Sequence, residues 1–569
     1  MNEPLNIRWL SRVPYAEALA IQEALFASRR GQHLLLLEHD HVFTYGPSSD
    51  LEKNLKCDPQ KVGADFVSVK RGGDITYHGP GQLVGYPVIT LPAKHTVTTD
   101  KSTVTTDSGN GSRGPADSVA HVFNVEQLII DTLNELGLSD VGRFDGFPGV
   151  WVGVSEGKPR KISAIGVRVG RNRTMHGFAL NVSTDMTYMR EHIVPCGIGD
   201  YPVTSLHEEG INVSMKHVVD VLAKHATQLW GHGHCVRQDV VWEERVEDLS
   251  LFSRGHGAGE PVRLMSRLAR AGVTEAIDIS SRKPDWIRPR VNHGSEVLSL
   301  KKTLRDLSLV TVCEEAGCPN LSECWSDGTA TFMVLGERCT RACGFCLVDT
   351  RKPLEPDLEE PSRVAEAVRR MGLSFVVLTM VARDDLLDHG MGHVAECVRV
   401  IREISPDIQV ETLISDAKGS DALELIFAAA PDVLNHNIET VARLQRAVRP
   451  SAGYARSLSV LSRSKRAGLT TKSGLIVGMG ETDDEVLATL SDLGAIGVDI
   501  VTIGQYLRPT THHLPVSRWV EPAVFEMYKE FGECTGIGHV ESSPLTRSSY
   551  HAKDAAHQVS EVPVSIGVK

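Results

Sequence analysis

The sequence predicts two α/β domains in one chain, a mixed α/β domain followed by a partial (β/α)6 barrel. The chain has 569 residues, which is too long for one ordinary hydrophobic core. Its first half places short β-rich runs around one long amphipathic helix. Its second half alternates six β-like runs with helical segments, which is the pattern of a parallel sheet.

Composition and charge narrow the class of protein. Apolar residues make up 41% and charged residues 23%, as in ordinary globular proteins. No apolar run approaches the ~18 residues of a membrane span. The N-terminus lacks the apolar core of a signal peptide, and its acidic residues argue against a transit peptide, so we expect a cytoplasmic protein. A net charge of -12 gives no general attraction to nucleic acid.

The first domain is expected to contain four β-like runs and one helix. The runs read HLLLLEHDHVFTYG, QLVGYPVITL, KISAIGVRVG and HGFALNV. The helix, VFNVEQLIIDTLNELG, has an apolar face and ends at a glycine suited to a left-handed C-cap. The apolar face consists of Val125, Leu128, Ile129, Leu133 and Leu136, and the C-cap glycine is Gly137.

Two segments set the expected domain boundaries. Residues 93–118 contain TVTTD twice and nothing that could form a core, which predicts a disordered insertion in the first domain. Residues 249–282 contain Gly, Pro and Arg with one short helical stretch, which predicts a linker. The first domain therefore spans residues 1–248 and the second spans residues 283–569.

The second domain is expected to be a curled parallel sheet. Its β-like runs read FMVL, SFVVLTMV, IQVETLI, DVLNHNI, KSGLIVGM and DIVTIGQYL. In such barrels the chemistry takes place at the C-terminal ends of the strands. The segment CTRACGFC directly follows the first of these runs, where an active site is expected.

The cysteines favour metal chemistry over disulfides. The chain has 11 of them, an odd number, and they concentrate between Cys313 and Cys397. Cys339, Cys343 and Cys346 have the spacing C-x3-C-x2-C. Three such thiolates can bind three irons of a [4Fe-4S] cluster and leave the fourth iron open. The alternative is a zinc knuckle, which would need a fourth Cys or His nearby.

A second set of three cysteines, Cys313, Cys318 and Cys324, has the spacing C-x4-C-x5-C. Together with the first set and RSSYHA at 547–552, it makes the region from RKPDWIRPR onward closely similar to lipoyl synthase, a radical S-adenosylmethionine (SAM) family. The resemblance implies that Cys339, Cys343 and Cys346 hold a cluster whose open iron binds SAM. It also implies an auxiliary [4Fe-4S] cluster on Cys313, Cys318, Cys324 and Ser549.

In that family, sulfur is inserted at C6 and C8 of an octanoyl chain attached to a protein lysine, and the auxiliary cluster supplies the sulfur. The resemblance also implies an electron donor such as ferredoxin or flavodoxin. Residues matching the SAM-binding G-x-I-x-G-x-x-E spacing are Gly474, Ile476, Gly478 and Glu481. Asn435, Asn437 and Arg449 match family motifs without an assigned role. Two departures, Met380 and Ala382, replace a hydroxyl and a carboxylate that the family usually carries.

The first half also carries candidate chemistry. The glycine-rich RGGDITYHGPGQ lets the backbone approach a ligand closely and offers Arg71, Tyr77 and His78 as polar contacts. Cys196, in IVPCGIG, is a candidate nucleophile. Because a thiolate needs a nearby cation or base, Lys161 is its candidate activator.

Taken together, these motifs make residues 5–235 similar to lipoyl(octanoyl) transferase. The resemblance implies a fold like that of lipoate and biotin ligases, and a catalytic dyad of Lys161 and Cys196. Octanoyl would pass from acyl carrier protein to Cys196, then to a lysine of a lipoyl domain in 2-oxoacid dehydrogenase E2 subunits or glycine cleavage H protein. The implied acyl site comprises Arg71, Gly72, Gly73, Asp74, Ile75, Thr76, Tyr77, His78, Ala164, Ile165, Gly166, Gly177, Phe178 and Ala179.

Two alternatives remain for the first half. It could be an ATP-dependent lipoate ligase of the same fold, although a ligase activates its substrate by adenylation and needs no thiol such as Cys196. It could also be a lipoyl-domain docking module, which would leave only the radical SAM half catalytic. Two matches to consecutive steps of one pathway favour a bifunctional enzyme.

Overall fold

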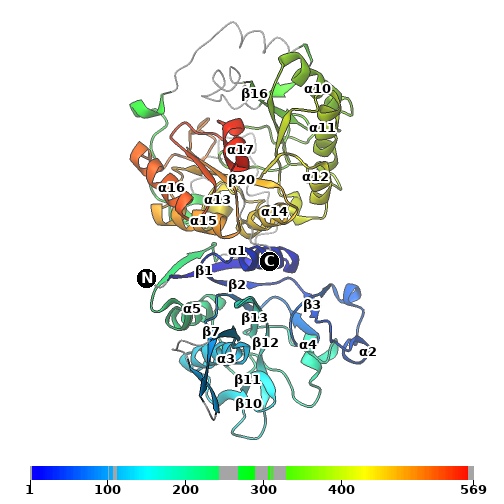
Figure 1. Cartoon of the computed structure of the whole chain (residues 1–569), viewed down its shortest axis with the longest axis vertical. Helices are drawn as coiled ribbons and strands as arrows, with labels where there is room; N and C mark the ends of the chain where they lie inside the picture. Colours follow the sequence, from blue (N-terminus) through cyan, green and yellow to red (C-terminus); the bar gives the residue numbers. More distant parts are fainter. Residues whose placement is uncertain are drawn as a thin grey trace. The chain divides into compact units, whose positions relative to one another are not determined.

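The computed structural model describes residues 3–99, 102–106, 112–242, 267–288, 306–307, 309–311 and 328–561. The chain divides into two compact units, Met1–Trp242 and Glu243–Lys569, and each is described by itself (Figure 1). The predicted linker, residues 249–282, lies mostly outside the described residues, so its bounds stay a prediction. Within the described part of the chain, no helix combines the length and apolar character needed to cross a bilayer.

The first unit is built on an eight-stranded mixed sheet in the order β10-β11-β12-β13-β6-β2-β1-β14. β1 runs parallel to β2 and β14, and the other pairs are antiparallel. The strands are β1 (Leu5–Arg12), β2 (Gln32–Glu38), β6 (Gln82–Val88), β10 (Val141–Phe144), β11 (Phe147–Val152), β12 (Arg160–Gly170), β13 (Arg173–Asn181) and β14 (Cys235–Asp239).

Three long helices pack on this sheet: α1 (Tyr15–Ser28), α3 (Ser118–Glu135) and α5 (Met215–Gly231). α3 is the predicted amphipathic helix, and it buries Val125, Leu128, Ile129 and Leu133 in the main core of the unit. It begins four residues earlier than the predicted segment, because Asp117 caps it by accepting from the backbone N–H groups of Val119 and Ala120. The predicted apolar face is confirmed.

A small sheet, β4-β3-β5, carries the end of the glycine-rich segment. Its strands are β3 (Val42–Tyr45), β4 (Asp65–Ser68) and β5 (Thr76–His78), and the short helices α2 (Leu51–Asn54) and α4 (Thr187–Glu191) lie in the same unit. Residues of β3, β5 and α4 share a second core, which includes Phe43, Tyr77 and Met189. This core packs β5 together with β3 and α4.

The predicted insertion differs from expectation in one respect. The structure pairs its two TVTTD repeats as antiparallel strands β7 (Ala93–Thr99) and β8 (Ser102–Thr106), and β9 (Ser112–Ala116) pairs with β7. Threonine and valine favour extended backbone because their β-branched side chains fit a pleated surface. A repeat rich in both residues can therefore pair with itself as two antiparallel strands.

The second unit has eight strands in sequence order, β15 to β22. The first pair is antiparallel and all later pairs are parallel, so the predicted parallel sheet is confirmed. The strands are β15 (Val310–Thr311), β16 (Thr329–Val334), β17 (Phe375–Met380), β18 (Gln409–Leu413), β19 (Val433–Asn435), β20 (Thr470–Val477), β21 (Ile500–Gln505) and β22 (His539–Ser542).

Helices alternate with these strands, as the sequence predicts. They are α10 (Glu360–Met371), α11 (Met391–Ile404), α12 (Leu423–Ala429), α13 (Gln445–Val448), α14 (Tyr454–Arg466), α15 (Asp483–Ala495), α16 (Pro522–Cys534) and α17 (Ala552–Glu561). α10, α11 and α12 bury valine, isoleucine and leucine against β16, β17 and β18. The segment with three cysteines, 339–346, follows β16 at the C-terminal end of the sheet, where the barrel pattern places the chemistry.

Candidate functional sites

The first unit contains a cavity of ≈ 340 Å³ between the 71–78 segment, β12, β13 and the turn that carries Cys196. Lys161 and Cys196 both line it. Twelve of the fourteen residues predicted to contact the acyl chain also line it: Arg71, Gly72, Gly73, Asp74, Thr76, His78, Ala164, Ile165, Gly166, Gly177, Phe178 and Ala179. Motifs that are far apart in sequence therefore converge on one cavity.

Two predicted acyl-site residues, Ile75 and Tyr77, lie elsewhere. Both are fully buried in the core beside Phe43. The reason is the period of an extended strand, in which successive side chains point to opposite faces. Thr76 and His78 face the cavity, so their neighbours face the core. Ile75 and Tyr77 support the site from behind and do not line it.

Cys196 occupies a strained turn. Its φ is +56°, in the left-handed region that a residue with a Cβ rarely adopts. Pro195 precedes it, Gly197 follows at φ +69°, and the Cys196 backbone N–H donates to the carbonyl of Ile75 at 2.9 Å. The bond to Ile75 ties the turn to the end of the glycine-rich segment and places the thiol in the cavity wall.

Lys161 is buried in β12, with 6% of its surface exposed. Its Nζ lies 5.3 Å from the centre of the Trp151 ring. No carboxylate among the described residues forms an ion pair with it. The backbone around Lys161 is fixed on both sides, because its N–H donates to Pro202 O and its carbonyl accepts from Thr204 N–H, both at 2.9 Å. The ammonium is thus held at the cavity without a competing partner.

Arg71 folds the glycine-rich loop. Its Nη1 donates to the carbonyl of Asp74 at 2.9 Å, and its Nη2 donates to the carbonyl of Thr44 at 2.8 Å. Burial lowers the pKa of Arg71, and the charge of Cys196 acts in the opposite direction. The guanidinium therefore shapes the loop and also lies within electrostatic range of the thiol.

The floor of the cavity depends on a close approach between β6 and β13. A Cβ on Gly177 would collide with the carbonyl oxygen of Gly85 and with the ring of Pro87. A Cβ on Gly85 would collide with the ring of Phe178. Glycine at 177 therefore lets the β13 backbone lie against β6, and glycine at 85 leaves room for the Phe178 ring.

Seven residues that line the cavity were not predicted from the sequence as site residues: Tyr15, Tyr86, Val122, Pro148, Val167, His176 and Ile198. Tyr15 and Val122 come from α1 and α3, and Tyr86 comes from β6, so no single motif contains them. His176 directly precedes the Gly177 motif and has a φ of +62°. That neighbouring motif was the one signal that could have indicated it.

The buried histidines of this site are neutral. Burial lowers the pKa of His78 to about 3 and that of His176 to about 4. The amide of Gln82 donates to Tyr77 O and Asn181 Oδ1, so its Oε1 must accept from His78 Nδ1, which lies 2.8 Å away. His78 therefore carries its proton on Nδ1.

In the second unit, backbone hydrogen bonds tether the cysteine loop, residues 339–346, from several directions. Cys339 N–H donates to Asp349 O at 2.8 Å, and Thr340 N–H donates to Ala382 O at 3.0 Å. Gly344 donates to Val448 O at 2.8 Å and accepts from Leu514 N–H at 2.9 Å. The path of the loop is thus set by the segment after β17, the end of α13 and the segment after β21.

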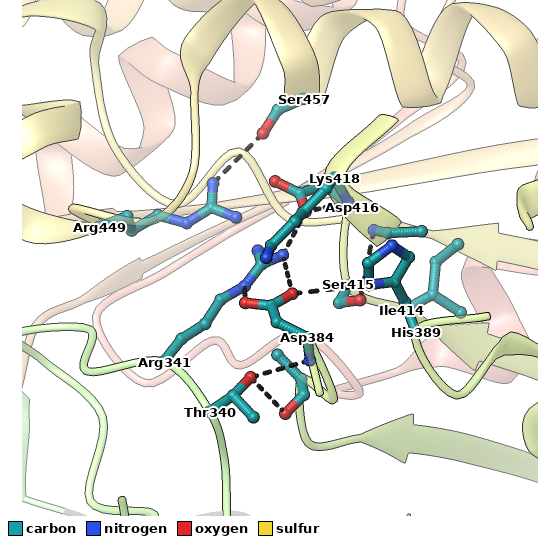
Figure 2. Close-up of polar contacts among 12 residues, drawn as sticks. Thr340, Arg341, Asp384, His389, Ile414, Ser415, Asp416, Lys418, Arg449 and Ser457 are labelled. Carbon is teal, nitrogen blue, oxygen red and sulfur yellow. Dashed lines mark hydrogen bonds and ion pairs between the residues drawn. The ribbon is translucent and has the colours of Figure 1, made fainter. Parts of the chain in front are cut away.

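One side chain of the loop forms a buried ion network, shown in Figure 2. Arg341 donates to Asp384 through Nε at 2.9 Å and Nη2 at 2.8 Å, and to Asp416 through Nη2 at 2.6 Å. Burial alone would raise the pKa of Asp416, but the charge and hydrogen bond of Arg341 hold it well below its usual range. Asp384 follows β17 and Asp416 follows β18, so Arg341 joins two strand ends.

The two departures from the family pattern leave the loop contacts intact. Ala382 replaces a carboxylate, yet its carbonyl oxygen accepts from both the N–H and the hydroxyl of Thr340. Met380 replaces a hydroxyl and packs against the core cluster of the barrel. Any residue can supply this backbone contact at position 382.

The predicted SAM-binding motif lies along β20 and the turn after it. Glu481 is buried and accepts from the backbone N–H groups of Gly478 and Met479. Burial raises the pKa of Glu481. Gly478 has a φ of +104°, which requires glycine. Glu481 therefore closes the turn, and contact of Gly474, Ile476, Gly478 and Glu481 with SAM stays a prediction.

The RSSY segment docks beside this motif. Ser548 Oγ accepts from Asn435 Nδ2 at 2.9 Å and donates to Asn437 Oδ1 at 3.2 Å. Asn435 in turn donates to Glu411, which forms a fully buried ion pair with Lys472 at 3.0 Å. Ser549, the next residue, is half-buried. Its predicted partners Cys313, Cys318 and Cys324 lie outside the described residues.

The three cysteines of the loop are a donor set that fits an iron–sulfur cluster. Within the described residues, no three His, Cys, Asp or Glu side chains converge on one metal position. Ligands of a [4Fe-4S] cluster each bind a different iron, so they need not converge. Cys339, Cys343 and Cys346 lie together on one tethered loop and are not joined by disulfides. Arg449, matched by sequence only, donates to Ile438 O at 2.9 Å, and its charge lowers the pKa of Cys343, although burial raises it more.

Comparison with known families assigns both halves. The family model for the lipoyl protein ligase A/B catalytic domain matches residues 14–107 and 108–227. The radical SAM superfamily matches residues 333–493, and the N-terminal domain of lipoyl synthase matches residues 270–318. Lipoyl synthase of Chlorobaculum parvum is 53% identical over 284 residues, which cover 49% of this chain and 97% of that protein. The chain belongs to the lipoyl synthase family.

Other lipoyl synthases are similarly close. That of Rubrobacter xylanophilus is 54% identical over 275 residues, covering 48% of this chain and 86% of that protein. Among solved structures, a lipoate-protein ligase A bound with ATP covers 42% of this chain and 90% of its own length, at 17% identity and a TM-score of 0.33. As a lipoyl synthase with a radical SAM domain, the chain is an enzyme that uses SAM and two [4Fe-4S] clusters. Its first half is a lipoyl protein ligase A/B catalytic domain.

Proposed function

We propose that the chain carries out two consecutive steps of lipoate synthesis. The first half, residues 1–248, transfers an octanoyl group onto a lysine of a lipoyl domain. The second half, residues 283–569, inserts sulfur at C6 and C8 of that octanoyl chain, and residues 249–282 link the two. The observation that carries the first assignment is the shared cavity of Lys161 and Cys196.

In the first step, the Cys196 thiolate attacks the thioester carbonyl of octanoyl-acyl carrier protein. The new C–S bond forms, the old one breaks, and the carrier leaves as a thiolate that takes up a proton. The ammonium of Lys161 stabilises the attacking thiolate, because no described carboxylate neutralises it. The apolar walls at Ile165, Val167 and Ile198 accommodate the chain.

In the second step, the acceptor lysine amine attacks the Cys196 thioester. An amide bond forms, and Cys196 leaves as a thiolate while the amine gives up a proton. Transfer between thioesters is nearly isoenergetic and amide formation is downhill, so a cysteine keeps the acyl group activated between donor and acceptor. A ligase that adenylates its substrate has no use for Cys196.

For the second half, SAM and the two clusters supply, when bound, the electron, the radical and the sulfur for insertion. The chain itself positions Cys339, Cys343 and Cys346 on a tethered loop after β16. Ser549 would complete the auxiliary site with Cys313, Cys318 and Cys324. An oxygen ligand holds a soft iron less firmly than a thiolate does, which suits a cluster that gives up sulfur. The expected partners are octanoyl-acyl carrier protein, lipoyl domains and an electron donor such as ferredoxin.

Mass spectrometry tests the acyl transfer. Incubation with octanoyl-acyl carrier protein should add one octanoyl group to the wild-type chain, on the peptide that contains Cys196. Cys196→Ala should remain unmodified, and Lys161→Met should acylate more slowly. An acyl adduct that persists in Cys196→Ala, or an absolute requirement for ATP, would favour the ligase alternative.

A second assay tests sulfur insertion. The chain, SAM and a reductant should convert an octanoylated lipoyl domain to its lipoylated form. Ser549→Ala and Cys318→Ala should lose this conversion but keep octanoyl transfer to Cys196. Normal sulfur insertion by either variant would show that the auxiliary-cluster assignment is wrong.

A further inference from the structure

We propose that Arg341 is a positioning residue that pre-forms the cysteine loop for its cluster, by clamping the loop to the ends of β17 and β18 through Asp384 and Asp416. The inference rests on the proposed role of Cys339, Cys343 and Cys346 as cluster ligands. It assigns a function to the one residue of CTRACGFC whose side chain reaches two neighbouring strand ends in Figure 2.

The geometry of the clamp is specific to arginine. The Arg341 fork binds Asp384 through two nitrogens, and Nη2 is shared with Asp416. The side chain of Arg341 is 6% exposed and that of Asp416 is 0% exposed, so solvent screens these contacts little. A lysine could satisfy one carboxylate but could not bridge both with the same planar geometry.

Backbone contacts continue the clamp into the loop. Thr340 Oγ1 accepts from Asp384 N–H at 3.0 Å and donates to Ala382 O at 2.9 Å. On the other side, Asp416 Oδ1 also accepts from Lys418 N–H at 3.0 Å. Ala417 and Lys418 have φ values of +43° and +49°. Two consecutive left-handed residues without glycine are costly, and the surrounding contacts must hold them in place.

The net charge of Arg341, Asp384 and Asp416 indicates that the clamp acts by fixing the loop and not by neutralising the thiolates. One arginine and two carboxylates carry a net charge of -1, so they do not neutralise the three thiolates. A clamp that adds no positive charge can still limit the conformations of the loop before any iron binds. Arg341 lies between Cys339 and Cys343, so fixing it fixes the spacing of two ligands.

The experiment uses the full chain in a background with Cys313, Cys318 and Cys324 replaced by alanine, so that bound iron reports one cluster. Arg341→Gln and Arg341→Lys are compared with Arg338→Gln. Arg338 precedes the loop, and among the described residues its half-buried side chain pairs with Asp349 and donates to the Lys352 carbonyl, so it is a control arginine outside the clamp. The readouts are the rate at which a chelator removes iron and the change in the electron paramagnetic resonance spectrum of the reduced cluster on adding SAM.

Arg341→Gln should lose iron about tenfold faster than the background, as expected for loss of a charge-assisted hydrogen bond. Its spectral response to SAM should weaken. Arg341→Lys should lose iron at a rate between those of Arg341→Gln and the background. Arg338→Gln should lose iron at the background rate. Release and spectra indistinguishable between Arg341→Gln and Arg338→Gln would overturn the proposal.

Two further variants keep the test decisive. If Arg341→Gln does not accumulate as soluble protein, Asp384→Asn and Asp416→Asn replace it, and unchanged iron release in both would overturn the clamp. The double variant Arg341→Gln with Asp416→Asn should increase the free-energy effect on iron release by less than the sum of the two single variants, because the two residues belong to one network. Replacing Cys339, Cys343 and Cys346 with alanine should remove all iron. If iron remains in this variant, the assignment of these cysteines as cluster ligands is wrong, and that result is distinct from a failure of the clamp.

Discussion

At the scale of single residues, the turn around Cys196 combines a strained backbone with a tight neighbour. Gly197 has a φ of +69°, and a Cβ there would lie 3.0 Å from Asp74 Oδ2. Asp74 is itself held by Asn54 Nδ2 at 2.6 Å, so it has little room to move. The position of the thiol therefore depends on the absence of a side chain next to it.

Gly197→Ala should slow acylation of Cys196 and destabilise the first unit. The control is Gly157→Ala, where φ is +70° and nothing lies within 4 Å of a new Cβ. Both variants should share the cost of a left-handed alanine, roughly 1–2 kcal/mol. Acylation rates by rapid-quench mass spectrometry should fall only in Gly197→Ala. An equal decrease of the acylation rate in both variants would mean that backbone strain, and not the contact with Asp74, controls acylation of Cys196.

The buried histidines give the first unit a pH dependence. Burial lowers the pKa of His39 and His176 to about 4 and that of His78 to about 3. Between these values and pH ~6.5, the unfolded chain binds protons that the folded chain does not, so stability falls as pH falls. Each fully buried histidine contributes roughly 1.4 kcal/mol per pH unit within that window.

Pulse proteolysis in urea at pH 7.5 and pH 5.5 measures this effect on the first unit. The urea midpoint should be lower at pH 5.5, and His78→Gln should reduce the difference by removing one of the titrating groups. The same midpoint at both pH values would contradict neutral burial of these histidines.

The same residues show what sequence can predict. The linear motifs identified most of the cavity wall, because each motif lies on one strand or turn. Tyr15, Tyr86 and Val122 were missed because separate elements bring them to the cavity, and that convergence exists only in the folded chain. The side chains of Ile75 and Tyr77 do not line the cavity, because the alternation of an extended strand places them opposite Thr76 and His78. Their contact with the acyl chain stays a prediction.

At the scale of elements, the segment after β22 is docked by close backbone contact. A Cβ on Gly504 of β21 would collide with the carbonyl oxygen of Thr546. Gln505 N–H also donates to Pro544 O at 3.3 Å. These contacts hold the segment at its start, and Ser548 holds it at β19. Sequence patterns predicted the RSSY motif but not this packing, because Gly504 belongs to no motif.

Gly504→Ala should therefore displace the RSSY segment and impair sulfur insertion, while octanoyl transfer to Cys196 is unchanged. Gly453→Ala is a suitable control, because the nearest atom to its new Cβ is 3.6 Å away, an ordinary contact. Comparing lipoyl formation with Cys196 acylation in each variant separates local displacement from general misfolding. Normal lipoyl formation by Gly504→Ala would show that the docking is not needed.

At the scale of the whole molecule, the chain combines two catalytic units with separate cores. In the second unit the strands lie in sequence order, as the alternation of β-like and helical runs predicts. In the first unit the sequence predicted the mixed α/β class but not the order of the strands. The buried network of Arg341, Asp384 and Asp416 was not predictable, because it joins residues 75 positions apart in the chain. Long-range ion pairs leave no local periodicity in the sequence.

Iron content tests the assignment of both cysteine sets together. The anaerobically reconstituted chain should hold about eight irons, because each of two clusters contains four. Replacing either cysteine set with alanine should leave about four, and neither replacement should affect acylation of Cys196. An unchanged iron content after one of the replacements would show that its cysteines are not ligands.

The close approach of β13 to β6 restricts how the proposed acyl site can change. A Cβ on Gly177, which lines the cavity, would collide with the carbonyl oxygen of Gly85 on β6. A side chain at position 177 would therefore have to separate β6 from β13. Selection for a shorter or longer acyl chain would have to act on the walls, at Ile165, Val167 or Ile198, where side chains can be exchanged for larger or smaller ones.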